Sequence, residues 1–179
     1  MSNDLWRTPP EVFNTLDREF NFFADMACDE ENKLCDLGFT EKDDSLSFDW
    51  ADKMYSARPS EVNQYVFVNP PYSNPMPWVK KAVEAQLDGL GVVMLLNCDT
   101  SVGWFAEALK TVSEIRYVIS DETPGCKRDY SSGRIQFVDE NGNPGKQNNK
   151  PQFVLIFNPF KVGARVTSYV TKKELYGLK

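Results

Sequence analysis

Two continuous apolar runs constrain the fold of this chain more than any other feature of its sequence. They are QYVFVN at 64–69 and GVVMLLN at 91–97. Neither alternates polar with apolar residues, so each predicts a strand buried on both faces, as in a parallel sheet covered by helices. Between them, residues 76–89 have a helical pattern, with Pro77 in the first turn and Gly89 at the end. The sequence therefore predicts an α/β fold.

The other expected elements extend this alternation. Thr8, Pro9 and Glu11 match a Thr-x-x-Glu capping box ahead of apolar residues at helical spacing, which predicts a helix that begins there. Further expected elements are a short strand that runs into a loop within 21–28, a helix around 30–36 and a strand near Leu46–Phe48 within the acidic segment 29–50, a helix at 101–112 opened by Ser101, a strand at 114–120, and a hairpin with a long Asn/Gly/Pro loop at 133–157. The prediction is a mostly parallel sheet with an antiparallel terminal hairpin.

Length and composition restrict the possible functions. The 179 residues predict a single domain, 1–179, without room for a separate target-recognition domain. There is no histidine, which excludes a histidine base, and none of the four cysteines belongs to a CxxC pair, so no metal site is expected. No membrane partner is expected and a cytoplasmic location is favoured, because no run is long and apolar enough to cross a bilayer and the start does not resemble a signal peptide.

The charge is distributed unevenly along the chain. The net charge is −6, but residues 1–50 carry 4 basic and 13 acidic groups, which leaves 16 basic and 13 acidic groups for the rest of the 20 and 26. The later part therefore has a balance of +3, against −9 for the first part. Such asymmetry is compatible with a side that faces phosphate, although charges of this kind are more often plain solvated surface.

The turn Asn69-Pro70-Pro71-Tyr72 is the strongest candidate for chemistry. The side-chain carbonyl of Asn69 and the main-chain carbonyl of Pro70 are two acceptors, and the prolines hold them in a fixed relation. Such a pair matches the two hydrogens of a conjugated NH₂ group, and acceptors out of its plane restore the nitrogen lone pair. Tyr72 can stack on the flat group that carries the amine. The alternative is that the four residues are only a turn.

The position of this turn favours function over a plain turn. Ligands of open α/β sheets bind outside the carboxyl ends of the strands. The expected strands end at Asp25, Asn69 and Asn97, which are all polar. These side chains are therefore expected at one edge of the sheet.

The chain resembles the phage-type DNA N6-adenine methyltransferases of the Dam family. The resemblance covers residues 6 to about 157 and is carried, in order, by WRTPPEVFNTL, DMACDEENKLC, DSLSFDW, FVNPPYSNPMPWVKKA, VVMLLNCDTSVGWF and GRIQF. It implies a Rossmann-like fold, S-adenosylmethionine as the cofactor, and transfer of a methyl group to adenine N6 of a flipped base in double-stranded DNA. Asn69, Pro70, Pro71 and Tyr72 would then be the catalytic residues.

The resemblance also implies a set of cofactor-binding residues. They are Trp6, Thr8, Pro9, Asp25, Ala27, Cys28, Asn32, Asp49 and Trp50. Thr8 would meet the methionine carboxylate, unless it serves only as a helix cap. Asp25 would lie near the cationic methionine end, and Asp49 and Trp50 would receive the adenine, although Trp50 can equally belong to the core. Cys28 stands where the family usually has glycine, so this loop departs from the pattern.

The substrate side is expected to involve the loop DETPGCKRDYSSGR at 121–134. Its candidate DNA contacts, together with Ser73 near the NPPY turn, are Lys127, Arg128, Tyr130 and Arg134. The alternative is a solvated loop of mixed charge. Trp78 and Trp104 are expected to pack rather than to stack on a base, and a homo-oligomer is compatible with the sequence.

Two rival functions remain open at this stage. One is an S-adenosylmethionine-dependent N-methyltransferase that acts on protein glutamine or an RNA base, since NPPY also occurs in such enzymes. The other is an inactive nucleic-acid-binding module of the same fold, which the missing glycines motivate.

Overall fold

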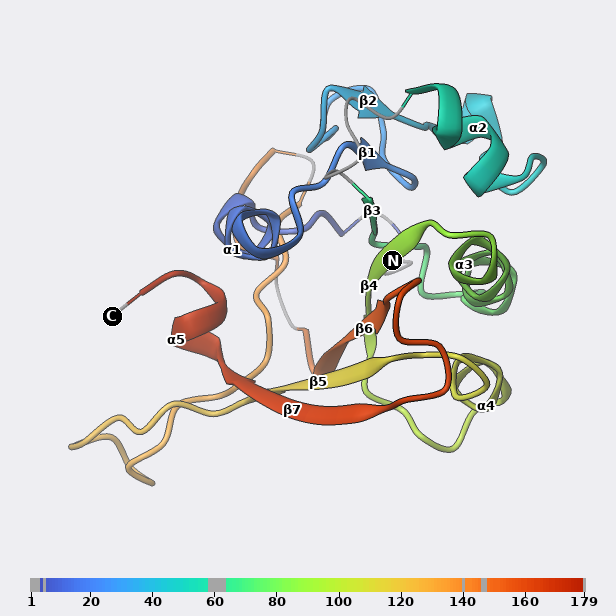
Figure 1. Ribbon diagram of the computed structural model, residues 1–179. Helices are drawn as coiled ribbons and strands as arrows, with labels where there is room; N and C mark the ends of the chain where they lie inside the picture. Colours follow the sequence, from blue (N-terminus) through green and yellow to red (C-terminus); the bar gives the residue numbers. More distant parts are fainter. Residues whose placement is uncertain (1–3, 5, 58–63, 140, 146–147, 179) are drawn as a thin grey trace.

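A seven-stranded sheet in the order β2-β1-β3-β4-β6-β5-β7 runs through the described part of the chain (Figure 1). The computed structural model describes residue 4 and residues 6–57, 64–139, 141–145 and 148–178. The strands are β1 (Ala24–Asp25), β2 (Leu37–Gly38), β3 (Tyr65–Val68), β4 (Gly91–Asn97), β5 (Glu114–Ile119), β6 (Gln152–Phe157) and β7 (Val166–Thr171). Strand β6 is antiparallel to β4 and β5, and the other neighbouring pairs are parallel. The expected α/β fold with a mostly parallel sheet is confirmed.

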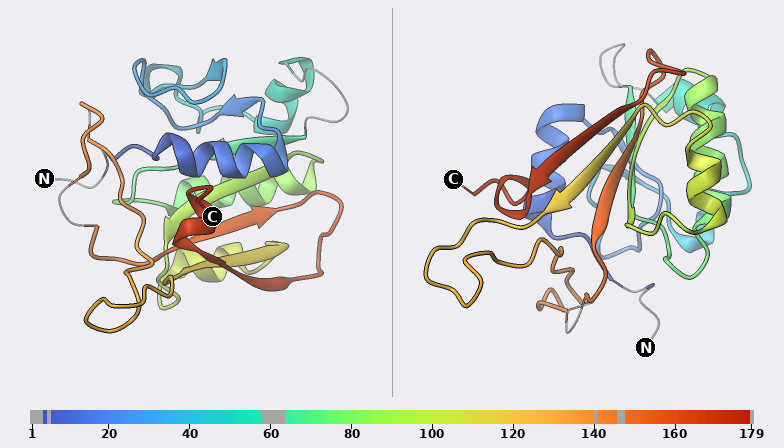
Figure 2. Two further views of the ribbon diagram at one scale, coloured as in Figure 1. Left: turned by 90° about the vertical axis from the view of Figure 1, so that its left-hand side faces the viewer. Right: turned by 90° about the horizontal axis from the view of Figure 1, so that it is seen from below.

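Helices cover both faces of this sheet. α1 (Pro10–Phe20) and α5 (Lys172–Leu175) lie on one face, and α2 (Trp50–Ala57), α3 (Met76–Leu87) and α4 (Gly103–Ala108) lie on the other (Figures 1 and 2). Because both faces are covered, β6 is buried throughout and β4 is buried up to its last residue, as the continuous apolar runs predicted. Each face has its own core, with Val12, Leu16, Phe67 and Phe137 on the α1 side and Met26, Trp50, Val79 and Phe153 on the α3 side.

Helix α1 begins one residue later than the capping box predicted. Pro9 has φ −57° and ψ 134°, which is extended, and the first helical residue is Pro10. A residue that precedes proline is disfavoured in the helical region, so Pro9 cannot be the first residue of the helix. Thr8 is thereby kept out of the cap, and its hydroxyl makes no capping hydrogen bond. The predicted capping role of Thr8 is wrong.

Three other local predictions differ from the structure. Helix α4 begins at Gly103 with Val102 as its N-cap, because the hydroxyl of Ser101 is engaged by Asp99 at 2.6 Å. Residues 30–32 form a turn rather than a helix, and residues 46–48 form a turn that continues into a bend rather than a strand. The elements that the sequence did not predict are β2, β7, α2, α5 and a 3₁₀ turn at Glu41–Asp43.

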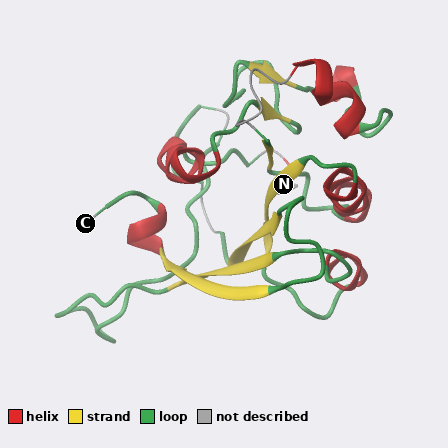
Figure 3. Ribbon diagram, in the orientation of Figure 1, coloured by secondary structure: helices red, strands yellow, loops and turns green. Residues whose placement is uncertain are grey.

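The first arm of the expected hairpin does not form a strand. Strand β6 already pairs with β4 on one side and β5 on the other, so residues 133–138 find no free edge beside it. The described residues between β5 and β6 make only isolated bridges, as the long green loop in Figure 3 shows. One bridge joins Val138 to Arg7, which ties this loop to the start of the chain.

Candidate active site

A cavity of about 660 Å³ opens at the carboxyl edge of β1 and β3. Asp25 ends β1 and pairs in register with Phe67 of β3, and Asn69 follows that strand directly. The cavity therefore lies where the ends of parallel strands bring polar residues together. Of the residues expected at the site, those that line it are Trp6, Thr8, Asp25, Ala27, Cys28, Asn32, Asn69 and Pro71.

The amide of Asn69 presents an unpartnered oxygen. Its Nδ2 donates a long hydrogen bond, 3.4 Å, to the main-chain carbonyl of Trp6. Its Oδ1 is buried and has no hydrogen-bond partner among the described residues. A buried acceptor left unpaired costs about 1–3 kcal/mol. A donor that enters the cavity and reaches this oxygen would remove that cost.

The rest of the NPPY turn is rigid and well packed. Pro70 is buried, and Pro71 lines the cavity. The ring of Tyr72 meets Phe137 edge-on at 5.9 Å, and it does not line the cavity. Its hydroxyl is buried and has no hydrogen-bond partner in the part of the chain that the structure describes, and burial raises the pKa of Tyr72 well above its ordinary value. The phenol is therefore neutral at any physiological pH.

Asp25 is a buried carboxyl at the floor of the cavity. It is 2% exposed, and its oxygens accept from the main-chain N–H of Ala27 at 3.2 Å and of Leu34 at 3.4 Å. Burial raises the pKa of Asp25 to about 6, opposed by these two hydrogen bonds and increased further by Asp29. A nearby positive charge would therefore stabilise the ionised form of Asp25.

The start of the chain forms one wall of the cavity. The indole of Trp6 stacks on Phe137 with ring centroids 5.7 Å apart, and Arg7 exchanges main-chain hydrogen bonds of 3.0 and 3.1 Å with Val138. Thr8 is 4% exposed, and its hydroxyl has no partner among the described residues. Pro9 is buried behind this wall and does not line the cavity.

The loop after β1 forms the opposite wall. The side-chain oxygen of Asn32 accepts from the N–H of Asp29 at 2.8 Å, and Asp29 Oδ1 accepts from the N–H of Glu31 at 2.9 Å, which shapes the turn. The thiol of Cys28 donates to the carbonyl of Phe39 at 3.4 Å. Burial, followed by the charges of Asp25 and Asp29, raises the pKa of Cys28 to about 12, so it is a neutral thiol.

The adenine-binding pair predicted at Asp49 and Trp50 lies outside the cavity. Trp50 is 1% exposed and packs in the core, with its indole N–H donating to the carbonyl of Ser45 at 2.6 Å. Asp49 is exposed, and its Oδ1 accepts from the N–H of Asp52 at 2.9 Å in the first turn of α2. Neither side chain lines the cavity, and the adenine-binding role of the pair stays a prediction.

Sequence reasoning missed most of the apolar wall. Leu34, Phe39, Leu46, Phe67 and Trp78 line the cavity. Trp78 was expected to pack, and it does pack, with its ring 6.2 Å from that of Trp50. Its place in the first turn of α3, directly after the NPPY turn, was the one available signal that it also faces the site.

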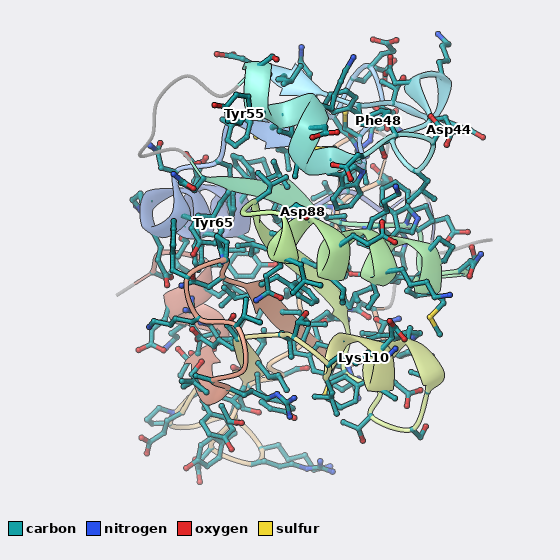
Figure 4. All side chains as sticks on the ribbon, turned by 45° about the vertical axis from the view of Figure 1, so that its right-hand side comes forward. Asp44, Phe48, Tyr55, Tyr65, Asp88 and Lys110 are labelled. Atoms are coloured by element: carbon teal, nitrogen blue, oxygen red, sulfur yellow. The ribbon has the colours of Figure 1, made fainter. Side chains whose placement is uncertain are left out.

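The cavity is strongly acidic at its mouth. The carboxylates among its described lining residues are Asp4, Asp25, Asp29, Glu30, Glu41 and Asp44, and the basic residue among them is Lys42. Asp44, labelled in Figure 4, projects from the loop ahead of α2. Arg7 pairs with Asp29 at 3.0 Å and Glu31 at 3.3 Å, which offsets part of this charge. The cavity favours a ligand that combines a flat, largely apolar body with a positive charge.

The predicted DNA-binding residues lie around a second hollow at the same edge of the sheet. Arg128, Tyr130 and Arg134 line a shallow groove of about 860 Å³ beside the ends of β5 and β6. Lys127 is exposed on the same loop but does not line the groove. Ser73 is exposed beside the NPPY turn, and its N–H donates to Asp4 at 2.9 Å.

Two kinds of feature were not found among the described residues. Within the described ranges, no group of three His, Cys, Asp or Glu side chains is placed to hold a metal ion. No helix in the same ranges is both long and apolar enough to cross a membrane.

The fold and the site together define an α/β protein of the Rossmann-like methyltransferase class. The sequence also matches the model of the family described as "Dam: DNA N-6-adenine-methyltransferase" over residues 1–178. The chain therefore belongs to the DNA N-6-adenine-methyltransferase (Dam) family, which consists of adenine-specific DNA methyltransferases. The family resemblance of the sequence motifs is confirmed.

Individual relatives agree with this assignment. The chain is 34% identical over 177 residues to a DNA N-6-adenine-methyltransferase of Haemophilus phage HP1, which covers 96% of this chain and 89% of that protein. It is 34% identical over 172 residues to a protein of the same name from Escherichia phage T1, covering 93% and 68%. It is also 33% identical over 76 residues to the putative methyltransferase YfdM of Escherichia coli K12, covering 42% and 74%.

Proposed function

We propose that this chain transfers a methyl group from S-adenosylmethionine to the exocyclic N6 of adenine in DNA. The observation that carries the proposal is that Oδ1 of Asn69, a residue that lines the cavity, is buried and has no hydrogen-bond partner among the described residues. A carbonyl oxygen in that position accepts a hydrogen from an amino group. Because a base inside the duplex cannot reach it, the proposal includes flipping of the adenine into the site.

The residues of the NPPY turn act on the amino group by orientation. Asn69 Oδ1 and the main-chain carbonyl of Pro70 accept the two hydrogens, which favours a tetrahedral nitrogen whose lone pair is available. Asn69 is neutral and takes no proton, so the proton leaves to water after the transfer. The gain comes from fixed geometry and preorganised dipoles rather than from a general base. Pro71 stiffens the turn.

Tyr72 is assigned to stacking on the adenine. A tyrosine ring can stack on a flat base through one of its faces. Its ring makes a T-shaped contact with Phe137 at a centroid distance of 5.9 Å. The neutral phenol adds no charge beside the base.

The residues around the cavity fit S-adenosylmethionine. The buried hydroxyl of Thr8 has no partner and offers a donor to a carboxylate, and Asp25 offers a negative charge to the cationic end. The apolar wall with Phe39 and Trp78 suits an adenine ring. When bound, this cofactor supplies an electrophilic methyl carbon on a positively charged sulfur. Trp6, Ala27, Cys28 and Asn32 complete the proposed binding set.

The DNA duplex is assigned to the side of the molecule that carries the loop 121–134. Arg128 and Arg134 are exposed on either side of Tyr130 and line one groove. Arginines spaced in this way can contact successive phosphates or a guanine edge, and an aromatic ring can occupy the gap left by a flipped base. Ser73, beside the NPPY turn, and Lys127 complete the proposed contacts.

The experiment is methyl transfer by the Asn69→Ala variant. Purified protein is incubated with S-adenosylmethionine labelled in the methyl group and with unmethylated plasmid DNA, and label at N6-methyladenine is counted after digestion. We expect the variant to lose at least about 100-fold in turnover while its circular dichroism spectrum is unchanged. Asn74→Ala, an exposed position in the same turn, is the matched control and should turn over like the wild type.

Two outcomes would count against the proposal. Turnover by Asn69→Ala at the wild-type rate would refute the role of the amide oxygen. Label in RNA or in protein glutamine, with none in DNA, would instead favour a methyltransferase for another planar amine.

A further inference from the structure

We infer that the N-terminal segment, Asp4 and Trp6–Thr8, is a positioning device that orients the amide of Asn69 and makes asparagine, rather than aspartate, the working residue at position 69. This inference rests on the proposed function, because one of its readouts is methyl transfer. It goes beyond that function by explaining what orients the side-chain amide of Asn69. The positioning group is the main-chain carbonyl of Trp6.

The first step is the geometry of the amide. Asn69 Nδ2 lies 3.4 Å from the oxygen of Trp6, whereas Oδ1 of this cavity-lining residue is buried and has no hydrogen-bond partner among the described residues. If the amide were turned over, Oδ1 would face the oxygen of Trp6, and two acceptors would oppose each other. The carbonyl of Trp6 therefore decides which of the two amide orientations is populated, and it selects the one that aims the acceptor at the substrate.

The second step is that this carbonyl is itself held in place. The indole of Trp6 stacks on Phe137, and Arg7 is bonded to Val138 through both of its main-chain groups. The guanidinium of Arg7 pairs with Asp29 on the opposite wall, and the carboxylate of Asp4 accepts from the N–H of Ser73 just after the NPPY turn. The N-terminal segment is thus held by Phe137 and Val138, by Asp29, and by Ser73 next to the NPPY turn.

The third step is the effect of a carboxylate at position 69. An ionised aspartate has only acceptors, so one of its oxygens would oppose the carbonyl of Trp6. A protonated aspartate has one O–H donor, which can replace the Asn69 N–H toward Trp6 and leave the other oxygen for the substrate. An Asn69→Asp variant should therefore resemble the wild type only when its new carboxyl group is protonated.

The surroundings strengthen this dependence on pH. A negative charge at position 69 would be disfavoured by the other acidic groups near the cavity and by burial, and the guanidinium of Arg7 is already engaged by two carboxylates. The charged or titratable groups that line the cavity or contact its walls are Asp25 of β1, Asp4 and Arg7 of the N-terminal segment, Cys28, Asp29, Glu30 and Glu31 of the loop after β1, Glu41, Lys42 and Asp44 ahead of α2, and Tyr72. Of these, Asp25 titrates in both proteins, so each measurement is compared with the wild type at the same pH.

The test compares Asn69→Asp with the wild type between pH 5.5 and pH 8. The first readout is methyl transfer to plasmid DNA. At pH 8 we expect the variant to be at least about 100-fold slower, and the ratio of variant to wild type to rise as pH falls, by up to about tenfold per pH unit. The second readout is the urea midpoint of unfolding, where the deficit of the variant should shrink as pH falls, since its raised carboxyl pKa in the folded state favours the protonated form.

The control is Asn14→Asp, which makes the same change at an exposed position of α1. It should follow the wild-type profiles in both readouts. An Asn69→Asp variant that works at the wild-type rate at pH 8 would overturn the inference, and so would deficits of rate and midpoint that are the same at every pH. Absence of methyl transfer in the wild type would sink the proposed function instead, and the midpoint profile would still decide the inference.

Discussion

Replacing Asp25 by asparagine should remove a measurable dependence of stability on pH. The wild-type carboxyl is buried at the floor of the cavity, and burial raises its pKa from 3.8 to about 6. The folded state therefore binds this proton more tightly than the unfolded state does. The contribution of Asp25 to stability is fully present below pH 3.8 and is lost as pH rises through about 6.

The magnitude of the effect on stability follows from the size of the pKa shift of Asp25. One pKa unit corresponds to about 1.4 kcal/mol, so the whole effect on the free energy of unfolding is about 3 kcal/mol. Roughly half of it, about 1.5 kcal/mol, falls between pH 5 and pH 8. That window lies above the isoelectric point of about 4.8, so the protein keeps a net negative charge during the measurement.

The assay is urea unfolding of both proteins, followed by circular dichroism at intervals of half a pH unit. Other carboxyls have the opposite effect: hydrogen bonds to Thr40, Ser101 and Thr171 hold the pKa values of Asp43, Asp99 and Glu174 below their usual range. Only the difference between wild type and Asp25→Asn isolates Asp25. We expect the free energy of unfolding of the wild type, relative to the variant, to fall by about 1.5 kcal/mol from pH 5 to pH 8.

A second readout on the same variant connects this carboxyl to the cofactor. In calorimetry at pH 8, Asp25→Asn should weaken binding of the cationic S-adenosylmethionine more than binding of S-adenosylhomocysteine, whose sulfur is neutral. The reasoning fails if the stability difference stays constant within about 0.5 kcal/mol from pH 5 to pH 8, because the buried carboxyl would then titrate as it does in the unfolded chain.

Two further predictions concern the core and the DNA-facing groove. Trp50→Ala should lower the free energy of unfolding in urea by about 3–5 kcal/mol, because it empties a large core position and removes the donor to the Ser45 carbonyl; a loss below about 1 kcal/mol would mean that the indole is not packed as described. Arg128→Ala and Arg134→Ala should each weaken binding of duplex DNA in fluorescence anisotropy, and each should reduce the slope of affinity against salt by about 1 if it contacts a phosphate. Lys80→Ala, exposed on α3, serves as the control, and an equal loss there would show that only general charge matters.

The predictions from the sequence agree best with the structure where backbone geometry and burial determine the fold. The apolar runs around Phe67 and Val93 can be satisfied only inside a covered sheet, so their pattern determined the fold class. Asn69 follows such a run immediately, which placed it at the carboxyl edge. The predicted catalytic turn and Asp25 therefore came together at one cavity, as expected from the sheet alone.

The predictions from the sequence agree least with the structure where a residue has two competing roles. Thr8 has a complete capping box, but the Pro9-Pro10 pair prevents the helix from beginning there, and the hydroxyl turns out to be buried and unpartnered. Trp50 carries a motif typical of a cofactor site, but its burial against Ser45 and Trp78 places it in the core. For Thr8 the neighbouring proline pair ruled out one of the two roles that the sequence offered, whereas for Trp50 the packing against distant residues showed its place in the core.

The sequence by itself determined the class of fold, the edge at which the site lies and the family to which the chain belongs. These depend on hydrophobic period, on turn chemistry and on motif order, which are local properties of the chain. Only the tertiary structure decided that β6 pairs with a neighbouring strand along both of its edges, that the acidic segment 29–44 lines the cavity, and that the Trp6 carbonyl contacts the Asn69 amide. The physical reason is that these contacts join residues far apart in the sequence, from 63 positions for Trp6 and Asn69 to 65 for Val92 and Phe157, so they depend on how the whole sheet and its covering segments pack.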